Sequence, residues 1–316
     1  METRLLDSDS DSLATAAQIL RDGGLVALPT ETVYGLGADA RNDTAVARIY
    51  EAKGRPSFNP LIAHVPDLAT ARRFAEFSPA ALEIAKHFWP GPLTLVLPLK
   101  RNAGISPLVT AGLDSLALRV PAGVVANKLL TEFDGPVAAP SANPSGRISP
   151  TTAQHVLAGL EGKIDAIIDG GACMVGVEST ILDLTGQPAL LREGGLPREV
   201  IENLIGTVAT GVENSTTPKS PGQLLSHYAP KAALRLNAYE AYDGELYLGF
   251  GTCPQAHLNL SAKGDLVEAA ANLFKAMHEL DRLGSPIAVA PVPDTGLGRA
   301  INDRLRRAAA PRDDQA

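Results

Sequence analysis

The feature that most constrains the fold is the alternation of short apolar runs with amphipathic stretches of helical length. Nine runs bounded by Pro, Gly or Asp are predicted to be strands: 25–28, 61–65, 93–97, 116–120, 137–139, 166–168, 180–184, 246–250 and 287–290. Two helices are predicted to begin at Ser78-Pro79 and Ser149-Pro150, where an N-cap residue precedes a proline. This alternation is typical of an α/β fold, and the irregular spacing of the strands favours a mixed sheet over a strictly doubly wound one.

A segment rich in Thr, Ser, Pro and Gly divides the chain. Between Thr207 and Pro230 the sequence TVATGVENSTTPKSPGQLLSHYAP lacks apolar periodicity, as expected of a linker. Beyond it, residues 265–283 are predicted to form a long helix, because one face would carry Leu266, Ala269, Ala270, Leu273, Met277 and Leu280. We therefore predict a larger domain over residues 1–206, a linker over 207–230 and a second, smaller α/β domain over 231–316.

Charge and composition exclude several classes of protein. The 28 Lys and Arg against 35 Asp and Glu give a net charge of −7, which disfavours binding to nucleic acid by bulk electrostatics. No apolar stretch approaches the roughly 20 residues of a membrane-spanning helix, and the acidic start resembles neither a signal nor a transit peptide. The two cysteines, Cys173 and Cys253, lack the spacing of a disulfide framework or a zinc site. We expect a cytoplasmic protein without membrane contact.

One glycine-rich tract is predicted to face a ligand. Residues 29–37, PTETVYGLG, follow a predicted strand and are dense in hydroxyl groups, which suggests a binding loop. Gly35-Leu36-Gly37 is only a weak match to a dinucleotide fingerprint, because no helix follows directly, and an ordinary glycine loop is the preferred interpretation. No Gly-x-x-x-x-Gly-Lys-Ser/Thr loop occurs in the sequence.

Several charged and polar residues are candidates for binding an anion. Lys53 and Arg55, on either side of Gly54, suit phosphate oxygens, although two cations at a helix C-terminus are an equally good interpretation. Ser141 and Asn143 follow a strand and suit either a ligand or an Asn-Pro turn. Arg119 within LALRVP is either a surface residue or a clamp for a carboxylate.

Together these stretches resemble one family, the threonylcarbamoyl-AMP synthases in their long form, with a YrdC-like catalytic domain, a linker and a C-terminal domain. The resemblance covers nearly the whole chain. It rests on PTETVYGLG at 29–37, Lys53-x-Arg55 with Ser141-x-Asn143, GVEST at 176–180, LREG at 191–194, SPGQLLSHYAP at 220–230 and GLGRAINDRLRRA at 296–308. It implies a YrdC-like mixed, twisted open sheet with a concave cleft, and a smaller Rossmann-like α/β domain.

The resemblance also implies a reaction and a site. The family condenses L-threonine, bicarbonate and ATP to L-threonylcarbamoyl-AMP with release of pyrophosphate. By motif match, the residues at the threonine end of the cleft would be Thr32, His64, Arg119, Ala139 and Ser179. Those at the ATP end would be Arg55, Asn59, Ser115, Ser141, Ser149, Arg192 and Tyr228, while Lys53, Arg55, Ser141 and Asn143 form the catalytic signature. His64 has the alternative interpretation of a satisfied strand histidine, and Tyr228 that of an aromatic that only packs the linker.

The implied cofactors and partners are few. Mg²⁺ is expected to be carried by ATP, because no acidic cluster offers a metal cage, and no organic cofactor is expected. The product would pass to a separate tRNA threonylcarbamoyl transferase, with direct tRNA contact left open, and we expect a monomer whose linker is a lid over the cleft. The alternatives are a non-catalytic tRNA-binding or double-stranded RNA-binding module, and a carbamoyl-transfer domain, which usually belongs to a much longer chain.

Overall fold

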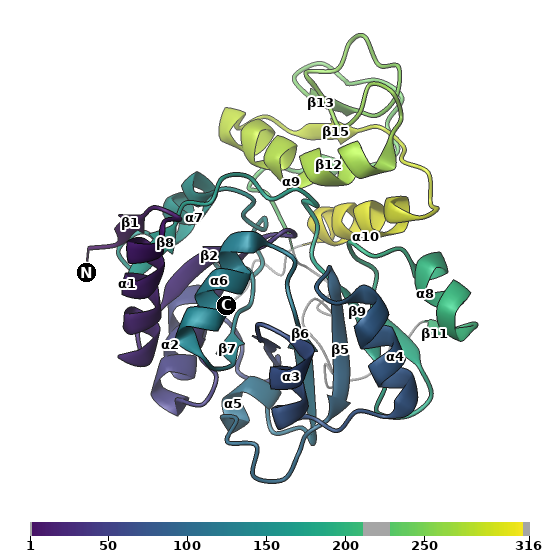
Figure 1. Cartoon of the computed structure of the whole chain (residues 1–316). Coiled ribbons are helices and arrows are strands. Elements are labelled where there is room, and N and C mark those ends of the chain that lie inside the picture. Colours follow the sequence, from purple (N-terminus) through teal and green to yellow (C-terminus); the bar gives the residue numbers. More distant parts are fainter. Residues whose placement is uncertain (1, 211–227, 312–316) are drawn as a thin grey trace.

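A mixed, twisted sheet forms the framework of the larger part of the molecule (Figure 1). The computed structural model describes residues 2–210 and 228–311. Within these residues the large sheet has 11 strands in the order β1-β8-β2-β3-β7-β4-β6-β5-β9-β10-β11. Its strands are β1 (Arg4–Leu6), β2 (Val26–Pro29), β3 (Tyr34–Asp39), β4 (Ile62–His64), β5 (Leu93–Pro98), β6 (Ser115–Arg119), β7 (Val137–Ala138), β8 (Ala166–Ile168), β9 (Thr180–Asp183), β10 (Ala189–Arg192) and β11 (Ala209–Thr210).

Eight helices accompany this sheet in the described residues. They are α1 (Ser10–Arg21), α2 (Asp43–Lys53), α3 (Leu68–Phe74), α4 (Pro79–Phe88), α5 (Pro107–Thr110), α6 (Val124–Phe133), α7 (Ala153–Leu160) and α8 (Arg198–Ile205). We call β1–β11 with α1–α8 the large domain. Parallel pairs such as β4 with β6 occur beside antiparallel pairs such as β5 with β6, so the predicted mixed sheet is confirmed.

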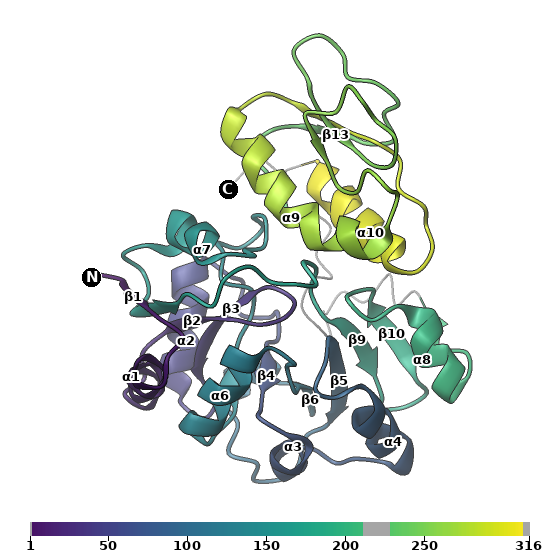
Figure 2. The ribbon, with the colours of Figure 1, turned by 45° about the horizontal axis from the view of Figure 1, so that its top comes forward.

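The second unit is smaller and purely parallel. Its four-stranded sheet has the order β12-β15-β13-β14, and the strands are β12 (Leu234–Arg235), β13 (Leu246–Gly249), β14 (Leu258–Asn259) and β15 (Ile287–Val289). Figures 1 and 2 show its helices α9 (Leu266–Leu283) and α10 (Leu297–Ala309) on the side that faces the large domain. The long helix predicted over 265–283 is thus confirmed. We call this unit the small domain.

The stretch predicted as a linker, 207–230, is described only at its two ends. Residues 211–227 lie outside the described residues, and the predicted lid falls mainly on them. Before them, β11 pairs with β10 and extends the large sheet to residue 210. After them, Tyr228 and Ala229 are buried. No helix in the described chain has the length and apolarity needed to cross a bilayer.

All nine predicted strands are present, but the interpretation of residues 34–37 as a loop is wrong. They belong to β3, which pairs antiparallel with β2 and includes both Gly35 and Gly37. A β-carbon at Gly37 would lie 2.9 Å from a methyl group of Val137 and 3.0 Å from one of Leu28. The glycine therefore permits close packing within a strand, and it does not mark a turn.

The two predicted Ser-Pro helix starts have different outcomes. Ser78 caps α4 as predicted, with its hydroxyl accepting a hydrogen bond from the Ala81 amide at 3.1 Å. The predicted start at Ser149-Pro150 is wrong, because α7 begins at Ala153 and its N-cap is Thr152. The Ser149 hydroxyl instead donates to Glu178.

The two faces of the large sheet differ, and this difference positions the functional site. Most of the apolar core lies on one face, where side chains such as Ala63 and Leu118 point. Successive residues of a strand point to opposite faces, so Ile62, His64, Ala117 and Arg119 point to the other face. Helices α1 and α6 cover that face at the β8–β2 end, while β4 and β6 present a smaller apolar cluster and polar residues. A cleft is therefore available over β4 and β6.

Candidate active site

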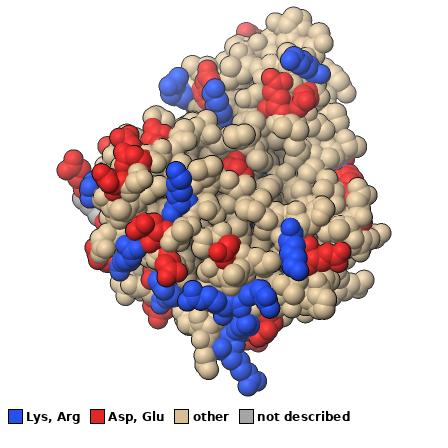
Figure 3. Space-filling model, in the orientation of Figure 1, with Lys and Arg blue, Asp and Glu red and all other residues tan. Residues whose placement is uncertain are grey.

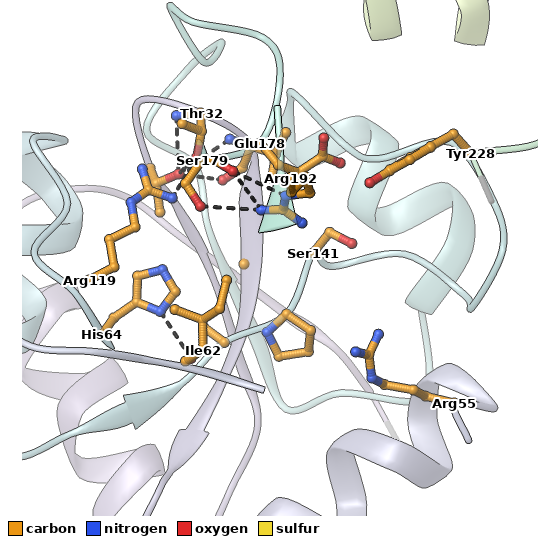
Figure 4. Close-up of a pocket in the computed structure, with 15 residues that line it drawn as sticks. Thr32, Arg55, Ile62, His64, Arg119, Ser141, Glu178, Ser179, Arg192 and Tyr228 are labelled. Atoms are coloured by element: carbon orange, nitrogen blue, oxygen red, sulfur yellow. Dashed lines mark hydrogen bonds between the residues drawn. The ribbon is translucent and has the colours of Figure 1, made fainter. Parts of the chain in front are cut away.

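A pocket with about 530 Å³ of empty space lies on this face of the large sheet (Figure 4). Its lining residues come from β3, β4, β6, β10 and the loops beside them: Thr30, Thr32, Val33, Gly35, Arg55, Ile62, His64, Arg119, Ala139, Pro140, Ser141, Glu178, Ser179, Arg192 and Tyr228. In Figure 4, Arg119, Thr32 and His64 lie at one end of the pocket, and Arg55 and Tyr228 lie at the other.

Sheet register brings the first end together. The parallel pairing of β4 with β6 places His64 beside Arg119. The Arg119 guanidinium is buried and donates from Nη1 to the Thr32 hydroxyl at 2.9 Å and from Nε to the Gly91 carbonyl at 3.3 Å. Its Nη2 lies 2.7 Å from a carboxylate oxygen of Glu31. An arginine fixed in this way at a pocket wall is suited to bind a carboxylate.

His64 is buried and uncharged. Burial, and next the positive charge of Arg119, lower the pKa of His64 to about 3. Its Nδ1 lies 3.3 Å from the Ile62 carbonyl oxygen. His64 therefore offers the pocket a neutral imidazole, and it adds no positive charge beside Arg119 at physiological pH.

The roof of the pocket is a hydrogen-bonded group built on Ser179. Its hydroxyl lies 2.7 Å from that of Thr94 on β5, and Arg192 on β10 donates to the Ser179 carbonyl at 2.9 Å and to its hydroxyl at 3.2 Å. A β-carbon at Gly194 would collide with the backbone of Glu178 and Ser179. The glycine of LREG thus allows the 191–194 segment to approach GVEST closely enough for Arg192 to reach Ser179.

Arg55 forms the other end of the pocket. Its guanidinium donates to the Pro60 carbonyl at 3.1 Å and to the Asn59 carbonyl at 3.4 Å, and burial lowers the pKa of Arg55 to about 10. The Asn59 side-chain amide is buried and has no hydrogen-bond partner among the described residues. A ligand at this end of the pocket would therefore find one cation, Arg55, beside the Asn59 side-chain amide, which has no hydrogen bond within the described residues.

Lys53 does not belong to the pocket lining. Its buried amine donates to the carbonyls of Ser141 and Asn143, each at 2.5 Å, and burial lowers the pKa of Lys53 well below its usual range. The Asn143 amide donates to the carbonyls of Pro144 and Arg147. Lys53 and Asn143 thus fix the turn that places Ser141 at the pocket, and direct contact of Lys53 with phosphate stays a prediction.

The structure brings most of the predicted site residues together. All five residues assigned to threonine line the pocket, as do Arg55, Ser141, Arg192 and Tyr228 of the set assigned to ATP. Asn59 and Ser149 lie one contact behind the wall, through Arg55 and Glu178 respectively. Ser115 stands at the first position of β6 and does not contribute to the pocket lining.

Two carboxylates of the site were not singled out from the sequence. Glu31 pairs with Arg119, and Glu178 is buried in the pocket wall. Burial alone would raise the pKa of Glu178, but Arg304, Arg192 and the hydrogen bond from Ser149 hold it below its usual range. Both residues stand inside the motifs PTETVYGLG and GVEST, where an acidic residue within an otherwise apolar or hydroxyl-rich run is the signal available in the sequence.

The pocket concentrates positive charge in an acidic protein. Arg55, Arg119 and Arg192 line it, whereas Glu178 is the one carboxylate among the described lining residues. On the face shown in Figure 3, both acidic and basic side chains lie at the surface, with a group of basic side chains at the lower edge. The site is therefore suited to an anionic ligand with separated charges, such as a carboxylate at one end and phosphates at the other.

Comparison with known proteins gives a consistent result over nearly the full chain. The Sua5, YciO and YrdC family, described as telomere recombination, matches residues 18–194, and the C-terminal domain of threonylcarbamoyl-AMP synthase matches residues 196–310. The chain is 44% identical to a threonylcarbamoyl-AMP synthase of Pyrococcus abyssi over 93% of both chains. It is 42% identical to one of Bacillus subtilis, over 97% of this chain and 95% of that protein.

Solved structures agree with the fold. A crystal structure of P. abyssi Sua5 complexed with L-threonine is 41% identical in sequence, superposes with a TM-score of 0.89 and covers 98% of both chains. The large mixed sheet with its cleft is therefore a YrdC-like domain, and the small domain is the α/β domain that accompanies it in this structure.

Proposed function

The chain belongs to the threonylcarbamoyl-AMP synthase family and is thus a nucleotidyltransferase, and from this premise we propose that it condenses L-threonine, bicarbonate and ATP to L-threonylcarbamoyl-AMP with release of pyrophosphate. The observation that carries the proposal is the convergence of the threonine-assigned and ATP-assigned residues on one pocket. The relative crystallised with L-threonine supports the choice of amino acid.

The proposed chemistry requires alignment more than a covalent nucleophile. The amine of threonine takes up carbon dioxide from bicarbonate to give a carbamate and water. A carbamate oxygen then attacks the α-phosphorus of ATP, and pyrophosphate leaves. Two anions must approach each other, so a wall that holds both and offsets their charge supplies much of the rate enhancement.

Each end of the pocket has a role in this scheme. Arg119 binds the threonine carboxylate, with Thr32, His64, Ala139 and Ser179 forming the remainder of the threonine end. Arg55 and Arg192 bind phosphate oxygens, Asn59, Ser141 and Tyr228 contact the nucleotide, and Lys53 and Asn143 hold the 141–143 turn. Ser149 acts through Glu178, and Ser115 is proposed at the outer margin of the nucleotide. Arg119 and Arg55 lie at different ends of the pocket in Figure 4, which is consistent with one end for the threonine carboxylate and the other for the phosphates.

Mg²⁺ is proposed to enter on the phosphates of ATP. The described residues contain no group of three or more His, Cys, Asp or Glu side chains placed to hold a metal ion, and Glu178 is already ion-paired with Arg304. The nucleotide phosphates are then the main ligands of the ion, with water completing its coordination. The ion would supply further charge neutralisation at the phosphates, and no organic cofactor is part of the proposal.

The product is proposed to serve threonylcarbamoyl-adenosine modification of tRNA. It would be handed, in the cytoplasm, to a separate tRNA threonylcarbamoyl transferase by an enzyme that acts as a monomer. The net charge of −7 favours this arrangement over an RNA-binding module, because nucleic-acid contacts depend strongly on positive charge.

The proposed function is tested by tracing the carbon of ¹³C-labelled bicarbonate into the adenylate product. The purified chain is incubated with ATP, Mg²⁺, L-threonine and ¹³C-bicarbonate in carbon-dioxide-purged buffer, and pyrophosphate and the adenylate are measured. We expect pyrophosphate release to need both threonine and bicarbonate, and the adenylate to carry the label. ATP turnover independent of threonine would contradict the proposal, and tRNA binding without any turnover would favour the RNA-binding alternative.

A further inference from the structure

The motif at 296–308, GLGRAINDRLRRA, contributes no residue to the pocket lining, but one of its side chains contacts a lining residue. The motif forms most of α10 in the small domain. Arg304 on this helix is the largest of the fully buried side chains, at 0% exposed. Its Nε lies 2.9 Å from Oε2 of Glu178, and its Nη1 donates to the Glu193 carbonyl at 2.7 Å. The guanidinium of the small domain thus contacts Glu178, a lining residue of the pocket in the large domain.

The two oxygens of the Glu178 carboxylate have separate donors. Oε1 accepts from the Ser149 hydroxyl of the large domain at 2.5 Å, and Oε2 accepts from Arg304 of the small domain. Two donors from different directions leave the carboxylate a single orientation. Since Glu178 lines the pocket, the small domain fixes part of the pocket surface.

Tyr228, another lining residue of the pocket, is also in contact with the small domain. Its ring lies 5.3 Å from the Arg304 guanidinium carbon and stacks on Phe274 of α9 with ring centroids 5.6 Å apart. Tyr228 has a φ of 63° and is buried, so its position depends on packing from both sides. The small domain therefore supports a second lining residue of the pocket.

The GVEST loop also fits closely against the small domain. Gly176 has a φ of 76°, and a β-carbon there would collide with the backbone of Ala270 and Ala271 on α9. The loop that carries Glu178 and Ser179 is thus fitted to α9 at its start and bonded to α10 two residues later.

The buried Arg304–Glu178 ion pair is not explained by a contribution to the free energy of unfolding. Desolvating two charges offsets most of their attraction, and packed apolar residues of similar volume often stabilise a protein equally well or better. A buried pair is better suited to fixing a geometry. Here the fixed group is a carboxylate in a pocket that otherwise presents three arginines.

We propose that Arg304 is a positioning residue for the reaction: it holds Glu178 and Tyr228 in their places in the pocket, so that the small domain completes the active site of the large domain. This inference rests on the proposed function for its kinetic readout. It assigns a task to the small domain and to the motif at 296–308.

The test compares four variants: Arg304→Met, Glu178→Gln, the double variant, and Arg306→Met as the matched control. Arg306 is an exposed arginine on the same helix. We expect Arg304→Met to lower kcat/KM for pyrophosphate release by about 10- to 100-fold, the scale of losing one or two charge-assisted contacts. Arg306→Met should behave as the parent chain, and Arg304→Lys should recover part of the loss because the charge returns without the planar fork.

The pH profile separates positioning from folding. Arg304→Met removes one of the groups that hold the pKa of Glu178 down against burial, so this pKa rises and the acid limb of kcat/KM should move to higher pH. This limb should disappear in the double variant, in which position 178 has no carboxylate to protonate. The double variant removes both partners of the Arg304–Glu178 pair, so neither is left buried without the other, and it remains informative if Arg304→Met folds poorly.

Two results would overturn the proposal. One is a folded Arg304→Met with the parent kcat/KM and pH profile. The other is a double variant that regains parental activity together with thermal stability, because Arg304 would then matter only for folding. We expect the double variant to be no more active than Glu178→Gln alone.

A separate measurement, ATP binding, distinguishes failure of the proposed function from failure of this inference. ATP binding to the same variants, measured by titration calorimetry, needs no turnover. If the parent chain binds ATP but releases no threonine-dependent pyrophosphate, the reaction is wrong. About 10-fold weaker ATP binding in Arg304→Met than in Arg306→Met would still support positioning of the pocket, and equal binding in that case would refute it.

Discussion

The Arg119 guanidinium at the threonine end of the pocket is paired with Glu31, its Nη2 lying 2.7 Å from Oε1 of that carboxylate. Burial alone would raise the pKa of Glu31, but the charge of Arg119 and its hydrogen bond lower it below the usual range. Arg119 lines the pocket and Glu31 does not. The carboxylate therefore holds the guanidinium without being part of the pocket lining, and the guanidinium itself remains a lining group that a ligand can contact.

Replacing Glu31 by glutamine should weaken threonine binding. The amide retains a hydrogen-bond acceptor but loses the charge, so Arg119 is held less firmly. We expect the KM for threonine to rise about 10-fold with the KM for ATP unchanged, the scale of one charge-assisted contact. Steady-state kinetics of Glu31→Gln and of Glu83→Gln, an exposed glutamate on α4, provide the measurement and its control. A fall in the threonine KM would instead show that Glu31 competes with the substrate carboxylate for Arg119.

Replacing Arg55 should change the kinetics with respect to ATP and leave the KM for threonine unchanged. Arg55 is the arginine at the end of the pocket opposite Arg119, and alanine removes its charge and its planar fork (Figure 4). We expect a change of about 10²-fold in the KM for ATP or in kcat. Arg41→Ala removes an arginine from a surface pair with Asp39 and serves as control. Unchanged ATP kinetics in folded Arg55→Ala would remove the phosphate role.

The pocket should select threonine over valine. Its lining includes the hydroxyls of Thr30, Thr32, Ser141 and Ser179, and those of Thr30 and Thr32 lie 2.8 Å apart. A site built to hydrogen-bond a hydroxyl rejects an isostere without one by up to roughly 10⁴-fold, whereas shape alone gives about 10²-fold. We expect the kcat/KM ratio of threonine to valine to exceed the shape limit, with serine intermediate. Equal turnover of valine and threonine would contradict hydroxyl recognition.

Local signals predicted much of the fold. The apolar face of α9 and the Ser78-Pro79 start of α4 are both confirmed, because periodicity and capping are properties of adjacent residues. Strand β3 was not predicted as a strand because its glycines are typical of a loop. The reason for Gly37, close packing against Val137 and Leu28 on the neighbouring strands, depends on how the strands pair. The Ser149-Pro150 start was wrong for a related cause, since the Ser149 hydroxyl is used by Glu178 in place of a helix amide.

For the site too, residues within local sequence motifs were predicted, whereas contacts between distant residues were not. Arg119 and Ser179 were found because family motifs mark them, and the structure brings them to one pocket. Glu178 and Arg304 are 126 positions apart, and no local pattern indicates that they pair. Lys53 was assigned to phosphate from its neighbours in sequence, whereas its amine is directed to carbonyls of Ser141 and Asn143. Partners that depend on tertiary packing are what a single sequence does not specify.

Acid should weaken the contact between the domains through two stacked histidines. His155 on α7 and His278 on α9 stack with ring centroids 3.9 Å apart, and the His278 Nε2 lies 3.1 Å from the Ser149 carbonyl oxygen. Burial, then the neighbouring ring and Lys275, lower the pKa of His155 to about 3. Burial also lowers the pKa of His278, against the opposing effects of the Ser149 carbonyl and Asp281.

The sign of the pH effect follows from these shifts. An unfolded histidine titrates near pH 6.5 and the folded pair does so at lower pH, so between these values the unfolded state binds more protons. The stability from neutral His155 is complete above pH 6.5, and it is lost progressively as the pH falls toward about 3. Solvent reaches part of the His155 ring and reduces the effect.

Substitution of His155 by phenylalanine tests this dependence, because the ring can still stack but cannot titrate. We expect the melting temperature of the parent chain to fall by roughly 1–2 °C more between pH 7 and pH 5 than that of His155→Phe, the shift produced by about 1 kcal/mol in a protein of this size. His64 titrates in both chains and cancels in the difference. His87→Phe, an exposed histidine on α4, should retain the full pH dependence of the parent. Parallel melting curves for the parent and His155→Phe across this range would show that protonation of the stacked pair does not act on the domain contact.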